Sequence, residues 1–298
     1  MASPVYFTKD INKATELFAP AGIDKLIEKD QPVALKIHFG EPGNTAYLKP
    51  AQVDPVKERI RALGGQPFYT DSNTLYQGKR GTTKDHLKTA QDHGYTNVII
   101  PEDTDSCTVE VGLKHFQRVH LSGVISRVGT IIALTHFKGH ELTGFGGVLK
   151  NLGMGFGTRQ GKLRMHQDCT NCPEVKTCVK NKTIEACWVG SSSLTQEKIA
   201  EYAYGAVKDK KAGYFNFIIN VSPNCDCYGY NEAPVVPDIG VLASLDPVAI
   251  DQASIDLVNQ RAGKDIFRQI YPEVDWNIQL TYAEKIGLGS RNYQLVVK

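Results

Sequence analysis

The stretch Val33-Ala-Leu-Lys-Ile-His-Phe39 is short and mostly apolar, which is typical of a strand covered on both faces of a sheet. A helix start at Asp54-Pro55 and an end at Gly64-Gly65 follow it. Further short apolar segments alternate with helical ones. We therefore expect parallel strands at 33–39, 66–70, 97–100, 130–135 and 214–221.

Helices between parallel strands act as crossover connections, which place helices on both faces of the sheet. The sequence thus predicts a three-layer α/β protein with a mainly parallel sheet and a small cysteine-rich insert. We expect a first α/β half at 1–160, a cysteine-rich metal or cluster insert at 161–193, and a second α/β half at 194–298 that completes the core.

Composition limits the class of protein. The chain has 298 residues, 41% of them hydrophobic and 22% charged, with a formal net charge of +2. This composition argues against a disordered chain. The small net charge gives no indication of a nucleic-acid partner, which usually needs a basic face, and we expect none. No apolar run reaches the roughly 18 residues that a membrane span needs. The first residues lack the basic and apolar regions of a secretory signal, so we expect a cytoplasmic protein without a membrane partner.

Six of the seven cysteines lie between positions 169 and 227, which favours metal or redox chemistry over a disulfide scaffold. Cys169, Cys172, Cys178 and Cys187 form one group whose thiolates suit zinc or an iron–sulfur cluster. Their spacing matches neither the bacterial ferredoxin run nor a zinc ribbon with two C-x2-C pairs. The residues alone therefore predict a site and leave its metal open.

A second pair, Cys225 and Cys227, comes directly after the strand predicted at 214–221. Parallel sheets place active sites beyond the carboxyl ends of their strands. The two thiols are therefore candidate cofactor ligands or catalytic groups, and the alternative is that they are inert core cysteines.

Three histidines also follow predicted strands: His38 ends 33–39, and His136 and His140 follow 130–135. We consider them candidate catalytic or metal-binding groups, although histidines in such places also serve as structural hydrogen-bonding residues. Eight glycines between 139 and 161 allow close backbone approach to a ligand, yet no P-loop or dinucleotide fingerprint is present. The candidate substrate-binding residues nearby are Asp71, Asn73, Lys138, Lys150 and Asn151.

Several long blocks resemble the uncharacterised iron–sulfur-centre domain proteins, the family of domain of unknown function 362. These blocks are residues 36–45, 70–76, 136–147, 150–155, 223–227, 237–240 and 246–251. Members of the family commonly carry a ferredoxin-like insert between a Gly-Lys-Leu segment, here 161–163, and the helix that precedes the Pro-Asn-Cys-Asp-Cys block. The insert is short in this chain and has no intact ferredoxin motif.

The resemblance implies an iron–sulfur redox protein, with a 4Fe-4S cluster favoured over zinc at the four insert cysteines. It would be an oxidoreductase or an electron-transfer component of anaerobic metabolism, with a redox partner protein or a small-molecule substrate. The alternatives are a zinc-stabilised metal- or ligand-binding protein without redox chemistry, or a metal-dependent isomerase or lyase that uses the histidines as acid and base.

Overall fold

The structure is a computed structural model that describes residues 2–76, 78–167 and 191–298. The insert cysteines Cys169, Cys172, Cys178 and Cys187 lie outside these residues, so the centre predicted for them stays a prediction.

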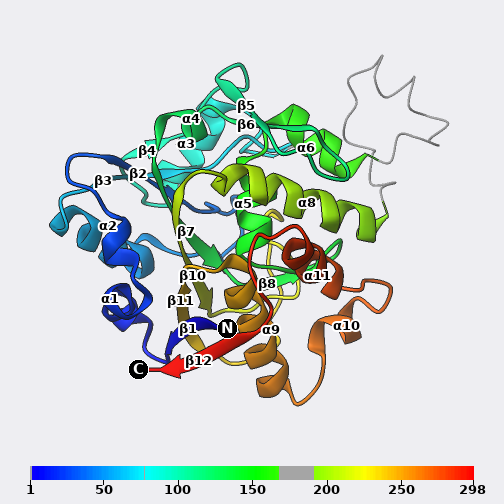
Figure 1. Ribbon diagram of the computed structural model, residues 1–298. Helices are drawn as coiled ribbons and strands as arrows, with labels where there is room; N and C mark the ends of the chain where they lie inside the picture. The colour runs from blue at the N-terminus through cyan, green and yellow to red at the C-terminus, as the bar shows by residue number, and fades with distance from the viewer. Residues whose placement is uncertain (1, 77, 168–190) are drawn as a thin grey trace.

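The main sheet has eight strands in the order β12-β1-β11-β10-β7-β2-β3-β4 (Figure 1). Its parallel block contains all five strands that the sequence predicts: β10 (Lys211–Ile218), β7 (Thr130–His136), β2 (Pro32–Lys36), β3 (Gln66–Thr70) and β4 (Val98–Ile99). The prediction of a mainly parallel α/β sheet is therefore confirmed.

The other side of the sheet contains the first and the last strand of the chain. Strand β11 (Gly240–Ser244) runs antiparallel to both β10 and β1 (Ser3–Thr8), and β12 (Tyr293–Val297) pairs parallel to β1. The N- and C-terminal strands are therefore neighbours (Figure 1). They lie at the edge of the sheet opposite to β4.

Both faces of the sheet are buried, because residues along each strand alternate between two cores. In β7, Ile131 and Ala133 belong to one cluster, whereas Ile132 and Leu134 belong to the other. The first face is covered by α5 (Val148–Phe156), α8 (Ser192–Val207), α9 (Pro247–Ala262) and α11 (Asn277–Lys285). The second is covered by the 3₁₀ helices η1 (Ile11–Leu17) and η2 (Ile23–Leu26) and by α1 (Phe18–Ala21), α2 (Pro50–Ala62) and α3 (Thr83–Asp92).

The remaining elements are short. The β5–β6 hairpin (Ser106–Glu110 and Arg118–Ser122) precedes α4 (Val124–Arg127). The β8–β9 hairpin (Lys138–His140 and Gly144–Gly146) precedes α5. Two further short helices are α6 (Arg159–His166) and α10 (Ile266–Ile270).

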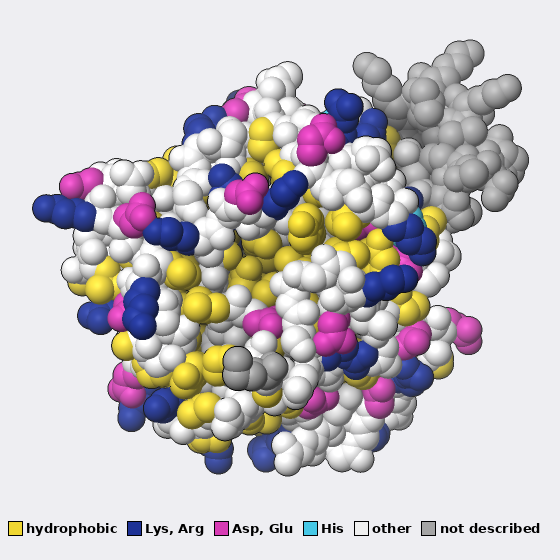
Figure 2. All heavy atoms as spheres, viewed as in Figure 1, with side chains coloured by type: hydrophobic (Ala, Val, Ile, Leu, Met, Phe, Trp, Pro, Cys, Tyr) yellow, Lys and Arg dark blue, Asp and Glu magenta, His cyan; other side chains and the backbone are white. Residues whose placement is uncertain are grey.

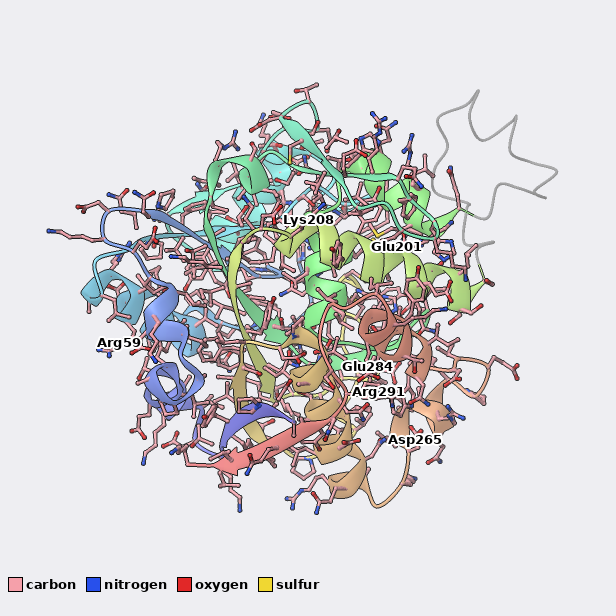
Figure 3. All side chains as sticks on the ribbon, in the orientation of Figure 1. Arg59, Glu201, Lys208, Asp265, Glu284 and Arg291 are labelled. Carbon is pink, nitrogen blue, oxygen red and sulfur yellow. The ribbon has the colours of Figure 1, made fainter. Side chains whose placement is uncertain are left out.

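Glu201 on α8, labelled in Figure 3, accepts hydrogen bonds from the backbone N–H groups of His115 and Phe116 and from the Tyr282 hydroxyl. It thereby ties the loop between β5 and β6 to α8 and α11.

The helix start predicted at Asp54 is wrong. Helix α2 begins at Pro50, where the fixed φ of proline suits the first helical position, and the Gln52 side chain accepts a hydrogen bond from Lys49 N. Asp54 lies inside the helix and its Oδ1 accepts a hydrogen bond from the Tyr69 hydroxyl at 2.9 Å. The aspartate therefore anchors the helix to β3 instead of capping it.

The helix start predicted at Asp246 is confirmed. Its Oδ1 accepts hydrogen bonds from Val248 N and Ala249 N, each at 2.9 Å. Its Oδ2 accepts from the Ser3 hydroxyl at 2.7 Å and from Ser290 N at 2.9 Å. One carboxylate thus caps α9 and also binds the first residue of β1 and the segment just before β12.

Replacing Asp246 by alanine should lower the free energy of unfolding by about 2 kcal/mol, because the helix cap and two tertiary hydrogen bonds are lost together. Urea unfolding followed by circular dichroism measures the change. The exposed Glu16→Ala substitution is the control and should change stability by less than about 0.5 kcal/mol. Equal stability of the two variants would contradict this role of Asp246.

On the face seen in Figure 2, basic and acidic side chains are interspersed and form no single-sign patch. No helix in the described ranges is both long enough and apolar enough to cross a membrane.

Candidate functional site

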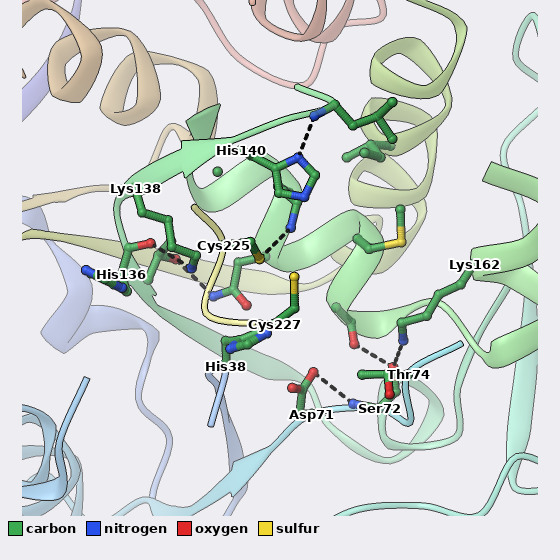
Figure 4. A pocket seen from close by; sticks show the side chains of 18 of the residues that line it. His38, Asp71, Ser72, Thr74, His136, Lys138, His140, Lys162, Cys225 and Cys227 are labelled. Atoms are coloured by element: carbon green, nitrogen blue, oxygen red, sulfur yellow. Dashed lines mark hydrogen bonds between the residues drawn. The ribbon is translucent and has the colours of Figure 1, made fainter. Parts of the chain in front are cut away.

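A pocket of about 110 Å³ lies at the carboxyl ends of the parallel strands (Figure 4). His136 ends β7, and His38 and Asp71 come shortly after β2 and β3. The loop after β10 contributes Cys225. This position is where open α/β sheets bind their ligands.

The structure brings together nine of the ten candidate residues that the sequence places around the core site. The lining includes His38, Asp71, His136, Lys138, His140, Lys150, Asn151, Cys225 and Cys227. Asn73 is not part of it, because its Nδ2 donates to Thr83 Oγ1 at 3.0 Å and its Oδ1 lies 3.4 Å from His86 Nδ1. Asn73 therefore ties its loop to α3, and the chemical roles of the other nine residues stay predictions.

Close backbone approach explains part of the glycine density between 139 and 161. Gly139 N donates to Ser222 O at 2.8 Å, and a Cβ at position 139 would lie 2.0 Å from Pro223 O. A side chain at this position would push the loop that carries Cys225 away from β8. Likewise, a Cβ on Gly155 would lie 2.4 Å from Lys36 Nζ, inside the pocket wall.

The surroundings of Cys225 favour its thiolate form. A hydrogen bond from the Cys227 thiol is the largest cause that brings the pKa of Cys225 well below its usual range, and Lys150, His140 and Lys138 add to it against the effect of burial. Lys150 Nζ lies 3.7 Å from Cys225 Sγ. The same hydrogen bond, together with burial, raises the pKa of Cys227, so Cys227 keeps its proton. The thiolate is the nucleophilic form of cysteine.

Two histidines of the pocket are oriented by backbone N–H groups. Leu142 N donates to His140 Nδ1 at 3.1 Å, so a neutral ring carries its proton on Nε2, and the ring hydrogen-bonds Cys225. Gly40 N donates to His38 Nδ1 at 3.2 Å. Burial, with Arg80 and Lys138 nearby, holds the pKa of His38 well below its usual value, so His38 is neutral with its proton on Nε2.

His136 has a structural environment. Its Nδ1 lies 2.8 Å from Asp226 Oδ2 and its Nε2 lies 2.8 Å from Ile219 O. Lys138 Nζ contacts the same carboxylate at 3.0 Å. Burial would raise the pKa of Asp226, but His136 and Lys138 outweigh it and lower that pKa. Both ring nitrogens of His136 therefore face oxygen acceptors, and the side chain ties the end of β7 to the loop that contains Cys225.

A second ion-pair network lies across the pocket. Lys36 Nζ is 2.9 Å from Asp71 Oδ1 and donates to Asn151 Oδ1 at 2.8 Å. Arg80 Nε donates to Glu41 Oε2 at 3.1 Å. Burial acts to raise the pKa of Asp71, yet Lys36 and its other positive neighbours leave it lowered. This network fixes the loop that follows β3.

Lys162 is a buried lysine whose Nζ donates hydrogen bonds to uncharged oxygens. Its Nζ donates to Ser72 Oγ at 2.5 Å and to Gly157 O at 2.7 Å. Burial lowers the pKa of Lys162 to about 7. Ser72 also donates to Gly155 O at 2.6 Å, so this group of contacts joins α6 and the end of α5 to the loop after β3.

The sequence reasoning missed several lining residues, notably Ser72, Thr74, Arg80, Glu141 and Lys162. Thr74 and Ser72 lie within the block 70–76, next to Asp71, so their position after a strand was the available signal. Arg80 and Lys162 have no such signal, because isolated basic residues are usually on the surface.

Among residues 2–76, 78–167 and 191–298, no group of three or more His, Cys, Asp or Glu side chains is arranged to hold a metal ion. The role of Cys225 and Cys227 as cofactor ligands stays a prediction.

Among solved structures, the lactate racemase apoprotein from Thermoanaerobacterium thermosaccharolyticum is similar, with 13% identity and a TM-score of 0.43. The match covers 73% of this chain and 51% of that protein, so the chain spans about half of its length. No curated protein matches the sequence.

The family comparison covers most of the chain. The domain of unknown function DUF362 matches residues 33–256, which include every strand of the parallel block except the first residue of β2, and all the candidate residues of the pocket. The chain therefore belongs to the DUF362 family.

Proposed function

We propose that this chain is an oxidoreductase for a small molecule, with the pocket at the strand ends as its active site and Cys225 as the reacting group. The observation that supports it best is the environment of Cys225, a buried thiolate in contact with Lys150 and hydrogen-bonded by Cys227 and His140. Such a thiolate is prepared to bond an electrophilic substrate atom.

The cofactor of this proposal is an iron–sulfur centre on Cys169, Cys172, Cys178 and Cys187. Four thiolates within one short segment are a complete donor set for such a centre. The described residues on either side of this segment lie at or beside the pocket. His166 lines the pocket just before it, and after it Ser192 donates a hydrogen bond to the O of the pocket-lining Leu142 at 2.7 Å. When bound, the centre supplies single electrons.

The residues of the pocket would divide the other tasks. Lys150 and His140 stabilise negative charge on Cys225 Sγ, and Cys227 retains a proton that it donates to the same sulfur. Neutral His38 presents an N–H group, and the Lys36–Asp71 pair keeps the adjoining loop in place. Leu142, Met154 and Ile199 exclude water from one side.

Anaerobic purification with iron, acid-labile sulfide and zinc analysis tests the cofactor. We expect iron and sulfide in equal amounts and broad visible absorption, all of which Cys172→Ser should abolish. Cys107→Ser is the matched control, because Cys107 Sγ lies 3.6 Å from Ser122 O, outside the pocket lining. Zinc without visible absorption would instead support the zinc-stabilised binding protein. The absence of iron and of zinc from both the unaltered protein and Cys107→Ser would contradict a metal centre.

A further inference from the structure

Two buried polar atoms of residues that line the pocket make no hydrogen bond. Thr74 Oγ1 and Arg80 Nη1 are buried, and the described residues offer neither of them a hydrogen bond. Both residues line the pocket. Thr74 N donates to Arg80 O at 2.9 Å, so the loop brings the two residues together. Leaving a buried polar group unpaired costs about 1–3 kcal/mol, which makes a bound ligand group the natural partner.

Arg80 is held rigidly with one nitrogen unused. Its Nε donates to Glu41, its Nη2 donates to the Tyr76 hydroxyl, and Nη1 lies 3.5 Å from Asp71 Oδ2 without a hydrogen bond. Arg80 is fully buried, and a guanidinium does not lose its proton in proteins. The guanidinium is thus paired with the carboxylates of Glu41 and Asp71, and its Nη1 still has N–H groups that make no hydrogen bond.

His38 supplies another donor. With Nδ1 occupied by Gly40 N, the neutral ring carries its proton on Nε2, and the ring lines the same pocket. Figure 4 places His38 near Asp71 and Cys227, on the lower side of the pocket. Arg80 is close enough to be the largest electrostatic influence on His38. Arginine, imidazole N–H and hydroxyl together form a donor set for an anionic oxygen group.

The lining also contains a group of apolar side chains, namely Leu75, Leu142, Met154 and Ile199. A fully solvated ion such as free phosphate gains nothing from contact with them, whereas the hydrocarbon body of an organic acid does. The cavity volume of about 110 Å³ limits this body to a compact one.

We propose that the pocket recognises small organic carboxylates, with the carboxylate hydrogen-bonded by Arg80 Nη1, Thr74 Oγ1 and His38 Nε2 and the hydrocarbon body against Leu142, Met154 and Ile199. This inference rests on the proposed function at one point only, namely that the bound carboxylate is the substrate. Recognition itself needs neither a metal centre nor turnover.

Calorimetric titration of the full chain with butanoate, butanamide and inorganic phosphate tests the ligand class. Butanoate should bind, and butanamide, which has the same shape but no charge, should bind about tenfold more weakly, because a hydrogen bond to a charged group is stronger than one between neutral groups. Phosphate should bind more weakly than butanoate. Equal affinity of butanoate and butanamide would overturn recognition of the charge, and tighter binding of phosphate would overturn the role of the apolar side chains.

Thr74→Val tests the assigned donors with little change of shape, whereas loss of Arg80 would leave Glu41 unpaired and risk misfolding. The variant should bind butanoate at least about tenfold more weakly, since one hydrogen bond to the charged carboxylate is lost. Thr130→Val is the matched control, because Thr130 begins β7 at the opposite end of the sheet and is equally buried. Equal affinity of the two variants, with native circular dichroism in both, would overturn the site.

The two proposals fail in different ways. Loss of iron and colour would contradict the proposed redox function while leaving butanoate titration unchanged. Conversely, a coloured, iron-containing protein that binds no butanoate would overturn this inference and leave the redox proposal standing.

Discussion

Iodoacetamide at about pH 6 should alkylate Cys225 at least tenfold faster than Cys107, because the nucleophile is the thiolate and, of these two cysteines, Cys225 has the lowered pKa. Burial raises the pKa of Cys107, so that residue is almost entirely protonated at this pH. Between about pH 6 and pH 8, the rate at Cys225 should depend less on pH than the rate at Cys107, which should rise about tenfold per pH unit. Site-resolved mass spectrometry of anaerobically prepared protein measures both rates.

Lys150 gives this prediction a specific control. Lys150→Met removes the ammonium group beside Cys225 Sγ, so the pKa of Cys225 should rise and alkylation at about pH 6 should slow several-fold. Lys150→Arg keeps the charge and should restore most of the rate. Lys84→Met, at an exposed position on α3, should have no effect. A rate at Cys225 no faster than at Cys107 would refute a preformed thiolate.

Replacing Asp251 by alanine should lower the free energy of unfolding by about 3–5 kcal/mol, since three buried donors would lose their acceptor. The carboxylate accepts hydrogen bonds from Val148 N at 2.7 Å, from Leu149 N at 2.9 Å and from Asn216 Nδ2 at 2.8 Å. Asp251 thus caps α5 from a distance, and α5 carries Lys150 into the pocket. Urea unfolding measures the loss, and the exposed Asp256→Ala on the same helix should cost less than about 1 kcal/mol.

The pH dependence of Asp251 has a definite sign. Burial raises its pKa from 3.8 to about 6, so the folded chain binds this proton more tightly than the unfolded chain does. The contribution of Asp251 to stability is therefore greatest below about pH 4 and falls as the pH rises to about 6. The stability of the native protein relative to Asp251→Asn should fall across this interval. A relative stability that rises there would show that the carboxylate has a lowered pKa instead.

The parallel block was predictable because its signals are local. Short apolar runs and glycine or proline at helix ends act within a few residues of the chain, so 33–39, 66–70 and 130–135 were recognised as strands. Helix α2 shows the limit of such reasoning. Asp54 and Pro55 form a convincing helix start, yet Asp54 binds Tyr69 on the next strand, and the helix begins at Pro50.

The sequence alone also determined that histidines and thiols follow neighbouring strand ends, since carboxyl ends of parallel strands meet at one edge. It did not separate their roles. His136 and His140 look alike in the chain, but Asp226 and Ile219 O occupy both nitrogens of His136, whereas His140 contacts Cys225. Which groups are paired, and which cations are left with a free donor as in Arg80, depends on contacts between residues distant in sequence. Burial and charge pairing act through space, so only the folded chain assigns the thiolate to Cys225 and the unused donor to Arg80.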